Sequence, residues 1–156
     1  MDDETTETDD ELLPPARLRG LASWQVHKAS TLGARMTARH MPLTARAEFA
    51  VLAALEEYGP LSQADLGRRL GLDRNEVSGI VTRLQRDHRI DRRVDPSNRR
   101  RNVVTLTETG KQRLGEIQQA ADAAQDELLA GLTPAERQQL SALLAKLLDT
   151  HGSQPA

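Results

Sequence analysis

The sequence contains no cysteine, and its only aromatic residues are Trp24, Phe49 and Tyr58. Without cysteine, disulfide bonds, thiolate metal sites and thiol-based redox sensing are excluded. The apolar residues are mainly leucine, alanine and valine, which suit packed helices better than a large sheet. A chain of 156 residues with this composition can form one compact, mainly helical domain, or a small module with dimerisation arms.

Long hydrophobic runs and chemical motifs are also missing. No stretch approaches the roughly 20 apolar residues of a membrane span, and no signal-peptide pattern opens the sequence. The four histidines have no spacing that suits a shared metal ion. No nucleophile elbow, phosphate loop or paired-carboxylate motif occurs. We therefore expect a cytoplasmic protein with no membrane partner, no metal, no cofactor and no enzymatic activity.

Charge is distributed unevenly along the chain. Residues 2–11 hold seven acids and no base, whereas the rest of the chain holds 16 acids against 21 bases. Residues 83–101 alone contain eight arginines and three aspartates, a net charge of +5. Such a concentration suits the binding of nucleic-acid phosphates. We expect residues 1–15 to be a disordered acidic tail, either without function or competing with DNA for these arginines.

The centre of the sequence predicts two short helices joined by a tight turn. Ser62 and Asp65 have the spacing of a capping box at the start of the first helix. Gly71 suits the left-handed backbone that ends such a helix. Asp73 and Glu76 repeat the capping-box pattern at the start of a second helix, which runs to about residue 87. This arrangement predicts a helix-turn-helix, whose second helix can enter the major groove of DNA.

The second helix divides into an apolar face and a polar face. The apolar face has aliphatic residues at helical spacing: Val77, Ile80, Val81 and Leu84. We expect base-edge contacts from Arg74, Asn75 and Ser78, because N-terminal residues enter the groove first. The alternative is that some of these three contact only phosphates. Phosphate contacts are predicted for four further residues, two of them at the start of the preceding helix: Ser62, Gln63, Thr82 and Arg83.

A β-hairpin is predicted after the second helix. Residues 90–94 and 102–106 are β-prone runs joined by a turn-rich loop over residues 95–101. Arg99 and Arg100 at the hairpin tip are placed to enter or flank a minor groove, where the negative potential favours arginine. An exposed patch that merely keeps the protein soluble is the alternative.

Helices are predicted on both sides of this module. The expected organisation is an N-terminal dimerisation helix (16–43), a winged helix-turn-helix domain (44–106) and C-terminal dimerisation helices (107–149), followed by a tail (150–156). Thr44 is the expected N-cap of the domain's first helix. Leucines make a dense apolar face on the short last helix. The helix has too little of its own domain around it to cover that face. A dimer interface is the economical explanation.

The sequence resembles the MarR family of winged helix-turn-helix transcription regulators. The resemblance rests on LSQADLGRRLGLDRNEVSGIVTRLQRD (61–87) and DPSNRRRNVVTLTETG (95–110), and it extends from about Leu21 to Leu148. The second segment, with aspartate, proline and paired arginines followed by Leu-Thr-x-x-Gly, is highly specific. The resemblance implies a mainly α-helical fold with a small β-hairpin wing and an intertwined helical homodimer.

The resemblance also implies a function. We expect a sequence-specific regulator of transcription, a ligand-responsive repressor that binds a pseudo-palindromic site in double-stranded DNA as a homodimer. Ligand sites in the family usually lie between the dimer helices and the DNA-binding module, and some urate-responsive members use a tryptophan of the first helix. Trp24 is therefore the candidate contact for a small aromatic or anionic effector, although a lone tryptophan is more often a packing residue. A winged-helix module that binds RNA or protein is the alternative function.

Three residues depart from the family pattern. Asn98 replaces the usual wing aspartate, so the carboxylate that often braces a neighbouring arginine is missing. His88 replaces the usual glycine before the wing, and histidine tolerates a left-handed backbone better than most residues. Gly79 lies inside the second helix, where it costs about 1 kcal/mol of helix stability. It either permits a close approach to DNA or is neutral, and the sequence leaves both interpretations open.

Overall fold

The computed structural model describes residues 13–152. In chain order the elements are α1 (Ala16–Arg19), α2 (Ala22–His40), α3 (Leu43–Tyr58), α4 (Gln63–Leu70), α5 (Arg74–Arg86), β1 (Ile90–Asp95), β2 (Asn98–Leu106), α6 (Glu108–Leu128) and α7 (Pro134–Gly152). Most of the predicted acidic tail and the last four residues of the chain lie outside the described residues. The mainly α-helical fold class with a β-hairpin wing is confirmed.

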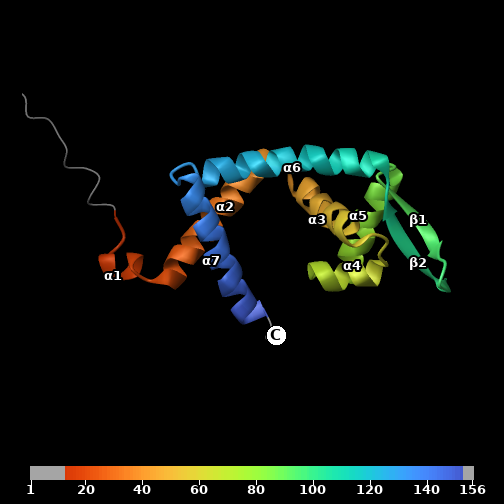
Figure 1. Ribbon diagram of the computed structural model, residues 1–156, viewed down its shortest axis with the longest axis horizontal. Helices are drawn as coiled ribbons and strands as arrows, with labels where there is room; N and C mark the ends of the chain where they lie inside the picture. Colours follow the sequence, from red (N-terminus) through yellow and green to blue (C-terminus); the bar gives the residue numbers. More distant parts are fainter. Residues whose placement is uncertain (1–12, 153–156) are drawn as a thin grey trace, which may run out of the picture.

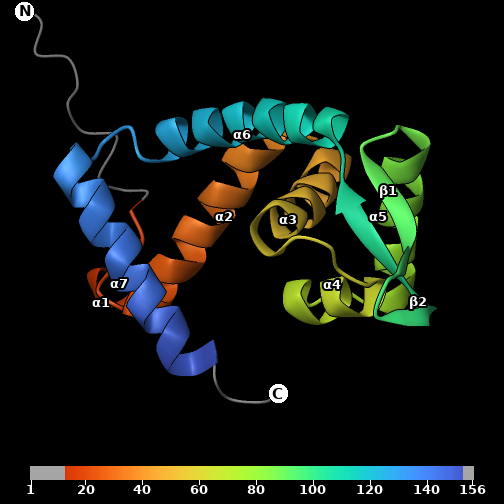
Figure 2. The ribbon, with the colours of Figure 1, turned by 45° about the vertical axis from the view of Figure 1, so that its right-hand side comes forward.

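The long helix α6 connects two parts of the molecule (Figure 1). Near its C-terminal end it lies with α2 and α7. Near its N-terminal end α3, α4, α5 and the hairpin gather on one side of it, and Figure 2 shows the same grouping from another direction. The molecule therefore carries its helix-turn-helix and hairpin at one end and its terminal helices at the other.

The hydrophobic core lies within the helix-turn-helix part. Its largest fully buried side chains come from α3, α4, α5 and the hairpin: Val51, Leu52, Leu66, Val77, Val81, Leu84, Ile90 and Val104. The predicted apolar face of α5 is buried, as expected from its spacing. Burial of each such side chain contributes about 1.5–3 kcal/mol. This packing holds α5 through its apolar face, so the opposite, polar face of the helix lies on the outside of the protein.

Strands β1 and β2 form the wing as an antiparallel pair, with Ile90 opposite Leu106. At the tip, the Asp95 carboxylate accepts hydrogen bonds from the Ser97 N–H (2.9 Å) and the Ser97 hydroxyl (2.6 Å), which stabilises the tight turn. Near the base of the wing, the loop between α3 and α4 joins the sheet through two backbone hydrogen bonds between Leu61 and Val104. These bonds attach the wing to the helix-turn-helix.

Three helix boundaries differ from the sequence prediction. The N-terminal dimerisation helix that was predicted over residues 16–43 is not continuous, because it is interrupted between α1 and α2 at Gly20 and Leu21, and it ends at His40. Thr44 is not an N-cap, since α3 begins one residue earlier, directly after Pro42. Proline fixes φ near −65°, and the extended Pro42 (φ −62°, ψ 157°) leads directly into the first helical turn. The last helix also continues past the predicted boundary at residue 149, to Gly152.

The link between α5 and the wing has the expected left-handed residue. His88 has a φ of +57°, and it is the only non-glycine residue with positive φ in the described range. Its N–H donates to Gln85 O, and the next residue, Arg89, donates to Leu84 O. These two bonds form the helix-ending motif in which a glycine is usual. The Thr107 hydroxyl, which caps α6, donates to His88 O at 2.8 Å.

Candidate nucleic-acid interface

Local hydrogen bonds set the positions of α4 and α5. The Ser62 hydroxyl accepts from the Asp65 N–H (3.1 Å), and the Asp65 carboxylate accepts from the Ser62 N–H (3.3 Å). Asp73 and Glu76 make the same reciprocal pair at the start of α5, at 2.9 and 2.8 Å. Gly71, at φ +64°, ends α4 as predicted. Both predicted capping boxes and the turn between the helices are confirmed.

The outward face of α5 carries most of the predicted base and phosphate contacts. Arg74, Asn75, Ser78 and Thr82 are all exposed. The Thr82 hydroxyl donates to Ser78 O within the helix (2.8 Å), which leaves its oxygen free to accept. Helical spacing places these residues along one side of α5. The structure thus brings together the residues that were predicted to face a DNA groove.

Arg83 is positioned differently from these four residues. It is half-buried, and its Nε is shielded from solvent without a hydrogen-bond partner among the described residues. One terminal nitrogen lies 3.8 Å from where a Cβ on Gly79 would stand. The guanidinium therefore folds back along α5. The predicted phosphate contact of Arg83 would therefore have to be made by the terminal nitrogens of its guanidinium, because its Nε is shielded from solvent.

Ser62 and Gln63 at the start of α4 differ in what they can offer a phosphate. Ser62 is buried, its hydroxyl donates to Asp65 at 2.6 Å, and the same oxygen accepts from Arg101 at 3.1 Å. The Ser62 side chain is thus occupied inside the protein, which the prediction of a phosphate contact did not anticipate. Gln63 is half-buried and has a backbone N–H at the first helical position, where helices offer unpaired donors.

At the wing, Arg99 and Arg100 are exposed at the start of β2, as predicted for a groove contact. The Asn98 side-chain oxygen accepts from the Arg100 N–H at 3.1 Å. The amide that stands in place of the family's aspartate therefore holds the wing backbone rather than an arginine side chain.

Arg101 is the wing arginine that pairs with carboxylates of two other elements. The sequence did not predict this role for Arg101. Arg101 forms an ion pair with Asp65 on α4, and its Nε lies 3.9 Å from the Asp95 carboxylate on β1. This contact joins the wing to the helix-turn-helix. The only sequence signal was a third arginine after the predicted pair, because its partner Asp65 lies 36 residues earlier in the chain.

Asp65 is one carboxylate through which pH should act on this junction. The hydrogen bond from the Ser62 hydroxyl holds the pKa of Asp65 below its ordinary value, and the Arg101 and Arg68 guanidiniums lower it further. A carboxyl group with a lowered pKa stabilises the fold above its unfolded pKa, about 3.9. That contribution disappears as the pH falls through the lower, folded pKa.

Asp65→Asn is therefore expected to lower the free energy of unfolding by about 1 kcal/mol at pH 7. The difference from the unsubstituted protein should shrink in acid, as the pH falls below the ordinary aspartate pKa of about 3.9 and through the lower folded pKa of Asp65, so the comparison is made at pH 7 and at about pH 2. Denaturant unfolding at both pH values measures it. Asp91→Asn, which removes an exposed partner of Arg93, is the control and should change little. A deficit of equal size at both pH values would contradict the electrostatic explanation.

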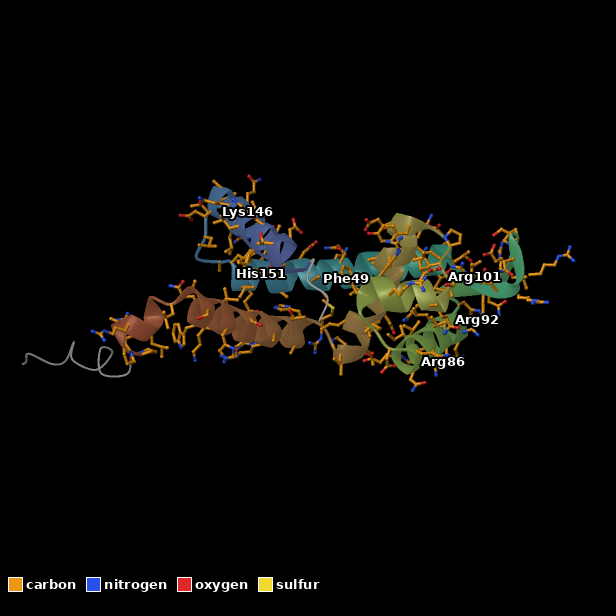
Figure 3. All side chains as sticks on the ribbon, turned by 90° about the horizontal axis from the view of Figure 1, so that it is seen from below. Phe49, Arg86, Arg92, Arg101, Lys146 and His151 are labelled. Carbon is orange, nitrogen blue, oxygen red and sulfur yellow. The ribbon has the colours of Figure 1, made fainter. Side chains whose placement is uncertain are left out.

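Further arginines extend the positive surface around α5 and the wing. Figure 3 shows Arg86 on α5, Arg92 on β1 and Arg101 on β2 at the same end of the molecule, away from Lys146 and His151 of α7. Arg92 and Arg93 are both exposed, and Arg93 pairs with Asp91 at 3.6 Å on the surface.

A buried ion-pair cluster lies where α3, α6 and the link between α5 and β1 meet. Glu48 on α3 is 6% exposed. Its carboxylate accepts from Arg89 at 2.8 Å and from Arg113 on α6 at 3.2 Å. Burial works against the charge of Arg113, but hydrogen bonds to Glu116 and Glu48 outweigh it and raise the pKa of Arg113. The cluster ties the end of α5 to α6.

Within residues 13–152, no cluster of three or more histidine and carboxylate side chains is arranged to hold a metal ion. In the same range, no helix combines the length and apolar character that crossing a membrane requires.

The sequence comparisons match this helix-turn-helix and wing. A MarR family profile matches residues 45–101, which run from α3 into β2. The HTH-type transcriptional repressor NicR of Pseudomonas putida is 33% identical over 103 residues, 66% of this chain and 65% of that protein. A putative transcriptional regulatory protein for the hcr operon of Thauera aromatica is 31% identical over 108 residues, 69% of this chain and 65% of that protein. The chain thus spans just under two thirds of these relatives' length.

Solved structures extend the similarity over most of the chain. Bordetella bronchiseptica BpsR, whose DNA binding is regulated by 6-hydroxynicotinic acid, has a TM-score of 0.70 and 29% identity over 87% of this chain and 99% of that chain. A probable transcriptional regulator from Pseudomonas aeruginosa has a TM-score of 0.66 and 32% identity over 84% of this chain and 99% of its own. Wild-type MarR from E. coli, at 22% identity and a TM-score of 0.68, shares the fold.

The fold is therefore a winged helix-turn-helix with additional helices at both ends of the chain. The protein belongs to the MarR family of transcriptional regulators, as the sequence resemblance indicated.

Proposed function

We propose that this protein is a transcriptional repressor that binds a pseudo-palindromic site in double-stranded DNA as a homodimer. The observation that carries the proposal is the exposed polar face of α5 beside an exposed arginine-rich wing. The residues proposed to contact DNA are Gln63, Arg74, Asn75, Ser78, Thr82, Arg83, Arg99 and Arg100, with Ser62 supporting the wing through Arg101. Arginine suits a guanine edge and asparagine an adenine edge in the major groove.

Uncovered apolar faces at the opposite end support the homodimer. Helices α1, α2 and α7 have no buried residue. Eight large apolar side chains on these helices or in the link between α1 and α2 are exposed: Leu18, Leu21, Val26, Leu32, Leu143, Leu144, Leu147 and Leu148. Apolar surface of this extent marks an interaction site, and a second copy would cover it symmetrically. A two-fold dimer would present two α5 helices about one DNA turn (~34 Å) apart.

Binding measurements on DNA and RNA test the proposal. A duplex selected from fragments of the source genome, a random duplex and the matching double-stranded RNA would be compared over a range of salt concentrations, with the mass of each complex from sedimentation. We expect the tightest binding on the selected duplex, two chains per site, and an affinity that falls steeply with salt. Equal binding to RNA would favour the RNA-binding alternative and contradict the proposal.

A small aromatic acid is the effector class that we propose. One support is BpsR, the structural relative whose DNA binding responds to 6-hydroxynicotinic acid. In the present chain, the half-buried Trp24 ring has the Lys28 ammonium 5.4 Å from its centroid. An indole with an adjacent cation suits a flat ring that carries a carboxylate. A mainly apolar groove of about 260 Å³ between α2 and α6 offers a second place for such a ring.

Titration of the DNA complex with 6-hydroxynicotinic acid and related phenolic acids tests the effector class. We expect DNA to dissociate and the emission of Trp24, the only tryptophan, to change over the same concentration range. Lys28→Met should weaken this response if the carboxylate lies beside Trp24. If DNA dissociates while the emission stays flat, the ligand does not contact Trp24. If neither signal changes, this effector class is wrong.

A further inference from the structure

We infer that Gly79 determines specificity by leaving a notch on α5 that admits the methyl group of a thymine. This inference rests on the DNA-binding role proposed above. Gly79 is the sixth residue of α5, which begins at Arg74, and it is exposed. It therefore lies within the stretch of the helix that is proposed to enter the major groove.

Nothing in the described chain requires glycine at this position. Its φ is not positive, unlike those of Gly59 and Gly71. A Cβ on Gly79 would meet a single atom within 4 Å, the terminal nitrogen of Arg83 at 3.8 Å, which is an ordinary contact with a flexible side chain. Alanine would fit this backbone and would favour the helix. The fold therefore gives no reason for the missing side chain.

Other glycines of the same module do have such a reason. A Cβ on Gly67 would lie 2.9 Å from Leu72 O, and a Cβ on Gly110 would lie 2.0 Å from Arg89 O. These two positions are closed by the protein's own backbone. The position at Gly79 is open instead, towards the side from which DNA is proposed to approach.

The neighbours of Gly79 indicate what would occupy the notch. On the helix surface Asn75 lies one turn before Gly79 and Thr82 nearly one turn after it, and both are exposed. The notch exposes only the Cα and the backbone of Gly79. Because Gly79 lies inside α5, its backbone N–H and C=O are used by the hydrogen bonds of the helix. The one apolar group on base edges in the major groove is the thymine methyl. Since Asn75 suits adenine, the notch and Asn75 together would favour adjacent A·T pairs.

Gly79→Ala, measured on two forms of the selected duplex, tests the inference. We expect the variant to melt about 3 °C higher than the unsubstituted protein, because alanine favours the helix. Its affinity for the selected duplex should fall by about tenfold, with less than about twofold change on random duplex. Replacing thymine with deoxyuracil in the selected duplex removes the methyl group. The deficit of the variant should then shrink to less than about threefold.

Gly115→Ala on α6 is the matched control, because a Cβ there meets nothing within 4 Å. It should raise the melting temperature similarly and leave DNA binding unchanged. The inference is overturned if Gly79→Ala binds the selected duplex like the unsubstituted protein, if its deficit is equally large on deoxyuracil DNA, or if it melts lower. If the unsubstituted protein itself shows no preference for any duplex, the proposed function fails as well, so the two failures are distinguishable.

Discussion

Gly110→Ala is expected to lower the free energy of unfolding by about 3 kcal/mol or more. A Cβ at this position would lie 2.0 Å from Arg89 O and 2.7 Å from the Leu106 side chain. The Arg89 carbonyl cannot easily move, since it accepts from the Thr107 N–H and its own residue's N–H donates to Leu84 O. The start of α6 would therefore separate from the link between α5 and the wing.

Denaturant unfolding followed by circular dichroism measures this effect. The control is Gly115→Ala on the same helix, which should stabilise the protein by up to about 1 kcal/mol. Together the two variants separate a close backbone contact from the general preference of helices for alanine. A Gly110→Ala variant within about 0.5 kcal/mol of the unsubstituted protein would show that α6 does not approach Arg89 this closely. The contact also explains the glycine of the Leu-Thr-x-x-Gly pattern, whose Thr107 caps the helix.

Glu48→Ala is expected to lower the free energy of unfolding by about 3 kcal/mol. The substitution removes the buried carboxylate that Arg89 and Arg113 share. Both arginines would then lie largely buried without this partner, at 22% and 28% side-chain exposure. Because water can still reach part of each guanidinium, we expect the lower end of the range for a broken buried pair.

Glu116→Ala is the control for this prediction, and unfolding in denaturant again provides the measurement. Glu116 also pairs with Arg113, at 3.1 Å, but its side chain is 66% exposed. Its loss should cost less than about 0.5 kcal/mol, as for most surface ion pairs. The same loss for Glu48→Ala as for this control would mean that the buried cluster contributes little to the fold.

The features that the sequence predicted correctly are those that depend on residues a few positions apart. The capping boxes at Ser62 and Asp73, the turn at Gly71 and the two faces of α5 each follow from spacings of three or four residues. His88 adopts the left-handed backbone that its position requires. Such features can be predicted from the sequence because helix geometry alone fixes which residues are partners.

The features that were missed depend on which distant residues the fold brings together. Asp65 and Arg101, and Glu48 and Arg113, are far apart in sequence, so no local pattern indicates either pair. The same limit applies to the hydrogen bonds of Ser62. A serine at a helix start is a plausible phosphate contact, but here its hydroxyl is enclosed by the capping box and by an arginine of the wing.

We propose that the outward face of α5 reads bases in the major groove, while Arg99 and Arg100 of the wing enter or flank a minor groove, where the negative potential favours arginine. The most direct test compares Arg74→Ala and Arg99→Ala by fluorescence anisotropy, on the selected duplex and on a scrambled duplex of equal length. We predict that Arg74→Ala weakens binding to the selected duplex by about 1–3 kcal/mol and leaves the scrambled duplex nearly unchanged. Arg99→Ala should weaken both duplexes and reduce the salt dependence. If Arg74→Ala weakens both duplexes equally, α5 does not read the sequence.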